Sequence, residues 1–232
     1  MHFPNLKFLD LEVWDALLLA IAASPRFPLI QHLKVVCEDP SPLTDILVKC
    51  ANTLESMDLT YDRLPSKSPD ITPTIHFPRL RTIQLVYKTG SHWYINASTP
   101  NLEAYIDDGR PNFVSCKLDV RNVTYLHVVG MPDLSRFPRL VTLLVDGRIK
   151  YLMEAIDFLR KHPQCSPDLA VIGYFDHISI EELEEVTTAL LAYAEETGRQ
   201  VTLERDQKKI VRKDDSFYWT PVRLLANGKR PV

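Results

Sequence analysis

The chain has 232 residues, of which 27 are lysine or arginine and 30 are aspartate or glutamate, so its net charge at pH 7 is −3. This balance gives nucleic acid or an anionic membrane surface no electrostatic advantage as the main partner. The longest strongly apolar run, residues 16–23, is about a third of what a bilayer span requires, and no basic stretch followed by an apolar core begins the sequence. We therefore expect a cytoplasmic or nuclear protein, with neither a membrane nor nucleic acid as its partner.

An apolar triplet recurs along the chain: an apolar residue is followed three and five positions later by two more, and successive copies start 17 to 29 residues apart. Seven copies are Leu6-Leu9-Leu11, Ile30-Leu33-Val35, Leu54-Met57-Leu59, Leu80-Ile83-Leu85, Leu102-Tyr105-Asp107, Val123-Leu126-Val128 and Leu140-Leu143-Val145. In the fifth copy Asp107 breaks the apolar pattern, and an eighth, less regular copy begins at Leu169. This spacing is typical of a leucine-rich repeat, in which each copy contributes one short strand. The predicted fold class is α/β: a leucine-rich-repeat solenoid of about eight coils over residues 1–175, with a parallel sheet on the concave side and helices and loops on the convex side.

Proline lies two positions before five of the triplets, at Pro4, Pro28, Pro78, Pro100 and Pro138. Phenylalanine precedes four of these prolines, at Phe3, Phe27, Phe77 and Phe137. A proline at the start of a strand stops a preceding helix from continuing into it. We interpret the phenylalanines as a spine of side chains stacked between coils.

The segments between the triplets predict different structures. Residues 13–23 are apolar on nearly all sides, which predicts a buried helix on the back of the first coil. Ser41-Pro42 resembles a helix N-cap followed by a first-turn proline, so we expect a helix to about Ala51. Residues 62–74 contain three prolines and predict a loop. From residue 80 to 145 the connections are short, and we expect them to return through turns.

The last third predicts longer helices and a terminal cap. Residues 149–161 carry apolar side chains on one helical face, and His162-Pro163 ends that helix. Ser179 and Glu182 form a capping-box pattern that begins a long helix, after which a strand follows. We expect residues 176–206 to be the polar C-terminal cap that stacked repeats need.

The sequence from Arg199 onward is basic, with nine basic and four acidic residues, a net charge of +5. Such a segment can attract an acidic partner or nucleic acid. Phe217-Tyr218-Trp219 lies in its middle, however, and aromatic clusters of this kind are uncommon in disordered segments. We therefore expect residues 207–232 to form a basic tail that docks in part on the last coil.

The residues between the triplet positions are the candidates for binding, because side chains alternate between the two faces of a strand. With the triplets pointing inward, these residues point outward onto the concave face. Aromatic and imidazole groups stand there among small polar residues, which is more typical of a protein-binding surface than of a small-molecule pocket. The alternative is an ordinary solvated sheet face. The predicted partner-binding residues are Phe8, Asp10, His32, Lys34, Asp58, Gln84, Tyr125 and His127.

The sequence offers little that catalysis needs. It holds only seven glycines and no phosphate-binding loop, nucleophile elbow or zinc-protease motif. Asp107 and Asp108 would face opposite ways on a strand, so we expect a turn or strand end there rather than an acid–base pair. Asp176-His177 precedes a helix start, where acidic residues serve the helix dipole, and no further metal ligand is near. We expect no enzyme, no catalytic residue, no metal and no cofactor.

The four cysteines, Cys37, Cys50, Cys116 and Cys165, are widely spaced. No C-x-x-C pair is present for zinc binding or redox work. We expect reduced, buried thiols, as is usual inside the cell.

Three features give the chain a family resemblance. They are the irregular triplets, the alternation of helical and helix-free linkers, and the strand entries Phe3-Pro4-Asn5-Leu6 and Phe77-Pro78-Arg79-Leu80. It resembles the repeat region of fungal F-box/leucine-rich-repeat proteins over about residues 1–173. In that family an N-terminal F-box docks on the cullin-based ubiquitin ligase and the repeats recruit the substrate. No F-box helices precede Leu6, so the ligase core is an expected partner only if an upstream F-box exists in a longer parent protein.

Two functions follow as expectations. The first is a non-enzymatic protein–protein interaction scaffold, the substrate-recognition repeat region of an F-box-like ubiquitin ligase adaptor. The second is a free-standing leucine-rich-repeat binding or inhibitor protein with no ubiquitin role. Both place a protein partner on the concave sheet.

Overall fold

The structure is a computed structural model that describes residues 6–12, 15–24, 28–38, 42–61, 74–87, 96–108, 117–174 and 179–205. Some predictions concern residues outside these ranges: Phe3 and Phe27 of the spine, most of the 62–74 loop, Cys116, Asp176-His177 and the basic tail.

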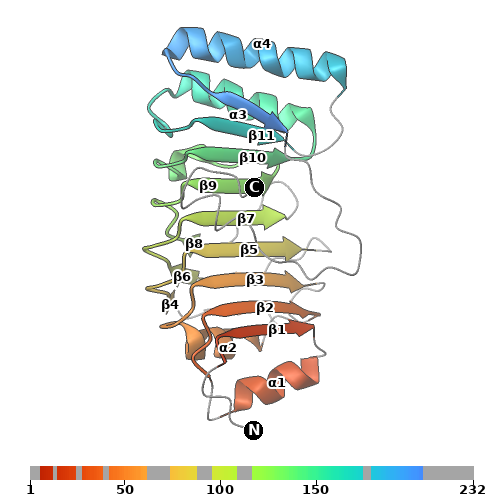
Figure 1. Ribbon diagram of the computed structural model, residues 1–232, viewed down its shortest axis with the longest axis vertical. Helices are drawn as coiled ribbons and strands as arrows, with labels where there is room; N and C mark the ends of the chain where they lie inside the picture. The colour runs from red at the N-terminus through yellow and green to blue at the C-terminus, as the bar shows by residue number, and fades with distance from the viewer. Residues whose placement is uncertain are drawn as a thin grey trace, which may run out of the picture.

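Nine strands form one sheet in the described part of the chain, and every neighbouring pair is parallel (Figure 1). Across the sheet they are β1 (Phe8–Glu12), β2 (His32–Cys37), β3 (Ser56–Tyr61), β5 (Thr82–Tyr87), β7 (Ala104–Asp108), β9 (Tyr125–Val129), β10 (Thr142–Asp146), β11 (Val171–Tyr174) and β12 (Thr202–Arg205). The order across the sheet follows the order along the chain. The prediction of an α/β fold with a parallel sheet is confirmed.

The apolar triplets meet one another across this sheet. The second residue of each triplet lies opposite that of the next, in the row Leu9, Leu33, Met57, Ile83, Tyr105, Leu126, Leu143 and Ile172. From Leu33 to Ile172 these side chains are almost fully buried. Ile172 belongs to the less regular copy that begins at Leu169, so this copy joins the same row. The copies of the triplet are therefore adjacent strands of one parallel ladder.

Backbone hydrogen bonds hold this register where each strand begins. The carbonyl oxygen of Lys7 accepts the amides of Gln31 and His32, at 2.8 and 3.0 Å. The same arrangement of one carbonyl and two successive amides joins each following strand to the one before it, as far as β11. A slip by one residue would break both bonds and turn every inward side chain outward.

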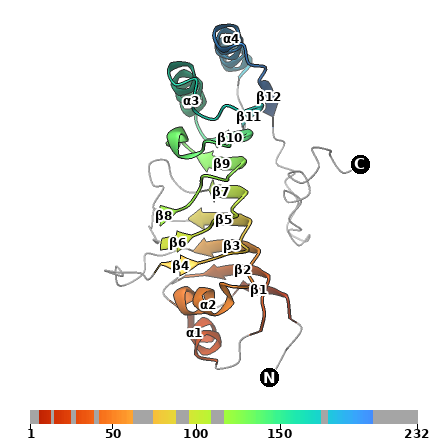
Figure 2. The ribbon, with the colours of Figure 1, turned by 90° about the vertical axis from the view of Figure 1, so that its left-hand side faces the viewer.

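The helices lie on one face of the sheet (Figure 2). They are α1 (Asp15–Ala23), α2 (Leu43–Cys50) and α3 (Ile149–Lys161), with α4 (Ile180–Thr197) packed beside α3 at the end of the molecule. Between α2 and α3 this layer holds a small parallel sheet of β4 (Ile75–His76), β6 (Asn96–Ser98) and β8 (Lys117–Leu118), followed by the 3₁₀ helix η1 (Leu134–Arg136). The sequence predicted turns in this region and not a second sheet.

The interior between the two layers is apolar and continuous. Phe77 and Phe137 are buried in it, as expected for the two spine phenylalanines that the structure describes. The helix predicted over residues 149–161 is observed with those bounds, and α2 begins directly after Pro42.

The first helix departs from its prediction. We expected a helix that is buried on all sides, but Leu19 of α1 is 56% exposed and Ala20 and Ala23 are exposed as well. These side chains are exposed because α1 lies at the end of the layer, where α2 packs against it from one side only. Lys49 of α2 ties the two helices by donating to the carbonyl oxygens of Ala22 and Ser24, near the end of α1.

The capping box at the start of α4 is confirmed. The amide of Glu182 donates to the Ser179 hydroxyl at 3.2 Å, and the amide of Ser179 donates to the Glu182 carboxylate at 2.9 Å. Gly198, with a φ of 69°, ends the helix in the left-handed region that favours glycine. We predict that Ser179→Ala lowers the free energy of unfolding by about 1 kcal/mol, because one amide of the first turn loses its acceptor. Urea denaturation of the variant and of Thr188→Ala, a matched change in the helix middle, measures the difference.

Cys37 and Cys50 are buried, while Cys165 is only half-buried. Burial raises the pKa of the Cys50 thiol to about 12, because the thiolate would lose its hydration there. We predict that iodoacetamide at pH 8 alkylates Cys165 and leaves Cys50 unmodified until the protein unfolds. Peptide mass spectrometry over a time course checks this order, and equal rates for the two residues would contradict the burial of Cys50.

Candidate functional site

The sheet face opposite the helices is here called the open face (Figure 2). Because the triplets point inward, the side chains between them lie on this face. The register arranges them in rows. The first row is Phe8, His32, Ser56, Thr82, Ala104, Tyr125, Thr142, Val171 and Thr202. The middle row is Asp10, Lys34, Asp58, Gln84, Ile106, His127, Leu144, Gly173 and Glu204. All eight predicted partner-binding residues lie in these two rows, so the structure brings them onto one surface.

In these two rows the β1–β5 side chains are polar or aromatic, and all are exposed or half-buried except Thr82, which is buried. In the middle row Lys34 lies between Asp10 and Asp58, and its Nζ is 3.1 Å from Asp10 Oδ2. Both side chains of this ion pair are partly exposed to solvent, so the pair contributes at most about 1 kcal/mol to stability. Its charges are therefore available to a partner at little cost to the fold.

An aromatic group stands at the edge of this polar region. Phe8 is 56% exposed, and its ring centroid lies 6.3 Å from that of His32 on the next strand. His32 Nδ1 lies 2.8 Å from the Ser56 hydroxyl, so the first row is linked across three strands. Aromatic side chains, phenylalanine included, are enriched at protein interfaces.

The middle row changes character at β7. Ile106, His127 and Leu144 follow Gln84, and all three are more than nine-tenths buried. Leu144 covers Gly173, because a Cβ atom at position 173 would lie 2.1 Å from Leu144 Cδ2. This part of the row is packed and offers little surface to a partner.

The eight predicted residues therefore differ in accessibility. Phe8, Asp10, His32, Lys34, Asp58 and Gln84 are exposed or half-buried, and they lie together on β1 to β5. Tyr125 is half-buried, and His127 is 8% exposed. The accessible part of the candidate surface is thus the β1–β5 half, here called the polar patch.

Asp107 and Asp108 are the last two residues of β7, which agrees with the expected strand end. Asp107 points inward, is 7% exposed and accepts a hydrogen bond of 2.8 Å from the Tyr105 hydroxyl. This inward position is that of Leu85 and Val128 in the neighbouring triplets, so Asp107 is part of the interior.

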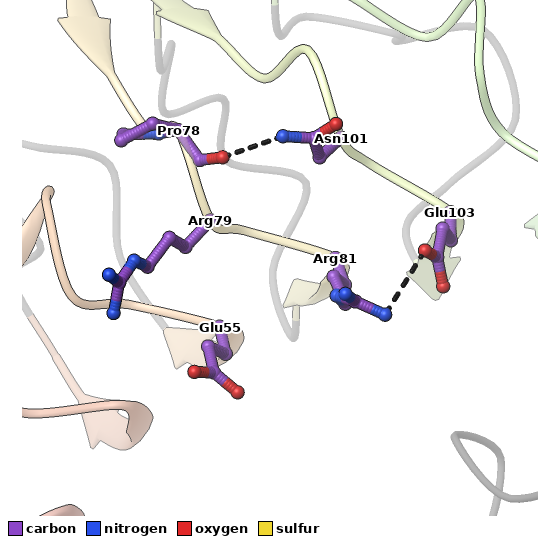
Figure 3. Close-up of a pocket in the computed structure, with 6 residues that line it drawn as sticks. All are labelled: Glu55, Pro78, Arg79, Arg81, Asn101 and Glu103. Carbon is purple, nitrogen blue, oxygen red and sulfur yellow. Dashed lines mark hydrogen bonds and ion pairs between the residues drawn. The ribbon is translucent and has the colours of Figure 1, made fainter.

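A shallow depression of about 380 Å³ lies where β3, β5 and β7 begin (Figure 3). Part of its polar lining is paired across the strand entries: Arg81 lies 3.4 Å from Glu103, and Asn101 Nδ2 donates to the Pro78 carbonyl oxygen at 2.7 Å. The same amide bond recurs one copy later, from Asn122 to the carbonyl of Pro100. A feature that repeats from copy to copy in this way joins the strand entries and is part of the scaffold.

The described ranges contain neither a cluster of metal ligands nor a membrane-spanning helix. Within these ranges no group of three or more His, Cys, Asp or Glu side chains is arranged to hold a metal ion. None of the helices in the described part of the chain is long and apolar enough to cross a membrane.

The fold and the site define the class of protein only broadly: an α/β protein with a nine-stranded parallel sheet, helices on one face and an accessible polar patch on the other. Comparison with protein-family models, with curated proteins and with solved structures finds no significant match for this chain.

Proposed function

We propose that this protein is a non-enzymatic interaction scaffold of the leucine-rich-repeat class and that a protein partner binds its polar patch. The repeat class is supported by the register, since copies of one apolar triplet occupy equivalent inward positions on successive parallel strands. In a solenoid of this kind each coil packs on its neighbours and the exposed sheet face is left for recognition.

The single observation that carries the proposed function is the polar patch itself. The middle row alternates in charge through Asp10, Lys34 and Asp58, and the exposed Phe8 ring lies beside it. Described helices lie on the opposite face only. Charged groups of alternating sign select a partner by complementarity, while an aromatic ring supplies contact area.

The resemblance to fungal F-box/leucine-rich-repeat proteins adds a role for the partner, namely that of a ubiquitination substrate. If the partner is such a substrate, this chain is the part of a ligase adaptor that recognises it. A free-standing binding protein would use the same patch, so the two roles share one surface and differ in what happens to the partner after binding.

A site-specific photo-crosslinker tests the surface. A benzoylphenylalanine at Gln84, in the polar patch, is expected to crosslink a discrete partner from an extract of the source cells. The same group at Val48, which is 52% exposed on α2, is the matched control and is expected not to do so. Adding Phe8→Ala and Lys34→Glu is expected to weaken the crosslink at Gln84 at least about tenfold.

Equal capture from Gln84 and Val48, or capture that survives Phe8→Ala with Lys34→Glu, would contradict the proposed surface. The captured protein then separates the two roles. Its half-life in cells is expected to lengthen when this protein is depleted if the role is that of a ligase adaptor. An unchanged half-life assigns the free-standing role.

A further inference from the structure

The last helix carries two apolar stripes, of which only one is covered. Val186, Leu190 and Tyr193 are buried against the preceding layer, where α4 packs on α3. A second set of residues, spaced by three or four along the helix, forms a separate stripe on the neighbouring side. This outer stripe consists of Ile180, Leu183, Thr187 and Leu191, and its aliphatic members are 75, 36 and 61% exposed. Large apolar groups exposed in a row mark a contact surface.

The side of α4 next to the outer stripe is acidic and is nearest to the stripe at Glu184 and Glu195. The 18 residues of α4 contain six glutamates and no lysine or arginine. Glu182 serves the capping box and Glu196 pairs with Arg160 of α3. The others, Glu181, Glu184, Glu185 and Glu195, are exposed and form no ion pair with another described residue. The chemistry that fits this surface is an apolar or aromatic segment bordered by positive charges.

The sequence that follows β12 has this chemistry. Residues 207–232 contain seven basic and two acidic residues, a net charge of +5. Phe217-Tyr218-Trp219 provides three successive aromatic rings, and basic residues occur on both sides of them along the chain.

The geometry of the last strands places the start of this segment next to the outer stripe. Because β11 and β12 are parallel and α4 connects them, α4 begins at the edge of the sheet where β12 ends (Figure 1). The first helical residues, including Ile180 and Leu183, thus lie at the edge where Arg205 ends β12. The eleven residues between Arg205 and Phe217 can span up to about 40 Å when extended, more than the roughly 27 Å length of α4.

We propose that residues 207–232 of the same chain dock on the outer stripe of α4, with the aromatic cluster against Ile180, Leu183 and Leu191 and the basic residues beside the acidic side of the helix. This contact covers the end of the sheet–helix stack from within the molecule, and it leaves the polar patch at the opposite end free for a partner.

Hydrogen–deuterium exchange of the full chain tests the docking. Amides in residues 207–232 are expected to exchange at least about tenfold more slowly than those of the isolated 26-residue peptide. Leu191→Glu is expected to remove this protection, because it places a charge in the stripe at an exposed position that the fold does not need. Val48→Glu, an equal change at an exposed site on α2, is the matched control and is expected to leave the protection intact.

Two further arms make the test decisive. Glu184→Lys with Glu195→Lys is expected to raise exchange in the tail, as is 0.5 M salt, since both weaken the charge pairing. Unchanged exchange in β10 shows that a variant has folded, and Ile180→Glu replaces Leu191→Glu if the latter does not fold. The proposal is wrong if the tail exchanges like the free peptide, or if its protection survives Leu191→Glu or Ile180→Glu. Protection that appears only with a dimeric mass would place the tail on a second copy and would also overturn it.

Discussion

Leu85→Ala is expected to lower the free energy of unfolding by about 2–5 kcal/mol, the largest single effect that we predict on stability. Leu85 is the third residue of its triplet and is fully buried between Leu59 on β3 and Asp107 on β7. The truncation removes apolar area and leaves a cavity that packed neighbours on both sides cannot fill.

Leu11→Ala is the matched control, because Leu11 has the same triplet position on β1. As an edge strand, β1 has a described neighbour on one side only, and Leu11 is half-buried. The expected loss is about 1 kcal/mol, since a partly exposed side chain leaves no closed cavity. Urea denaturation followed by circular dichroism compares the two variants. Equal losses would mean that the triplets do not fill a shared interior.

Gly173→Ala is expected to cost about 1–3 kcal/mol, the second large effect. The added Cβ would meet Leu144 Cδ2 at 2.1 Å and the Glu204 carbonyl oxygen at 3.1 Å. The leucine must move out of a packed row, whereas the carbonyl is held by the sheet. This glycine is thus required for the close approach of Leu144 across the open face.

The same substitution in a Leu144→Ala background provides the test. With the leucine side chain removed, the cost of Gly173→Ala is expected to fall below about 1 kcal/mol, because only the contact with Glu204 remains. Chemical denaturation of the four proteins of this cycle gives the coupling. A penalty of the same size in both backgrounds would show that Leu144 does not cover Gly173.

Much of the main sheet could be predicted from the sequence, because residues at the same position of successive triplets pair across neighbouring strands. Met57 and Ile83 are 26 residues apart, yet they lie opposite each other on the adjacent strands β3 and β5. The variable length of the repeat is taken up by the connection between the strands. The capping box of α4 and the helix over residues 149–161 were predictable for a similar reason, as both depend on residues close in sequence.

The second sheet and the environment of α1 could not be predicted in this way. Strands of two or three residues, such as β4 and β8, are too short to show any alternation of apolar and polar side chains. The apolar run in α1 suggested burial, but exposure depends on how many neighbours surround a helix. Leu19 is exposed because α1 lies at the end of its layer.

The candidate site was predicted in position more than in accessibility. Alternation along a strand identifies the face on which a side chain lies, so Lys34 and His127 were both placed on the open face. It does not tell which residues meet across strands, and the exposure of a side chain depends on those neighbours. The row of Ile106, His127 and Leu144 becomes visible only when the register is known.

Methyl-labelled nuclear magnetic resonance tests the central claim, that the recurring triplets are neighbouring strands of one parallel ladder. We expect nuclear Overhauser contacts in a continuous series from Leu33 to Met57 to Ile83, and in a second series from Leu126 to Leu143 to Ile172. Contacts that break these series, or that pair Leu33 with Leu59 and Val35 with Met57 as an antiparallel arrangement requires, would contradict it.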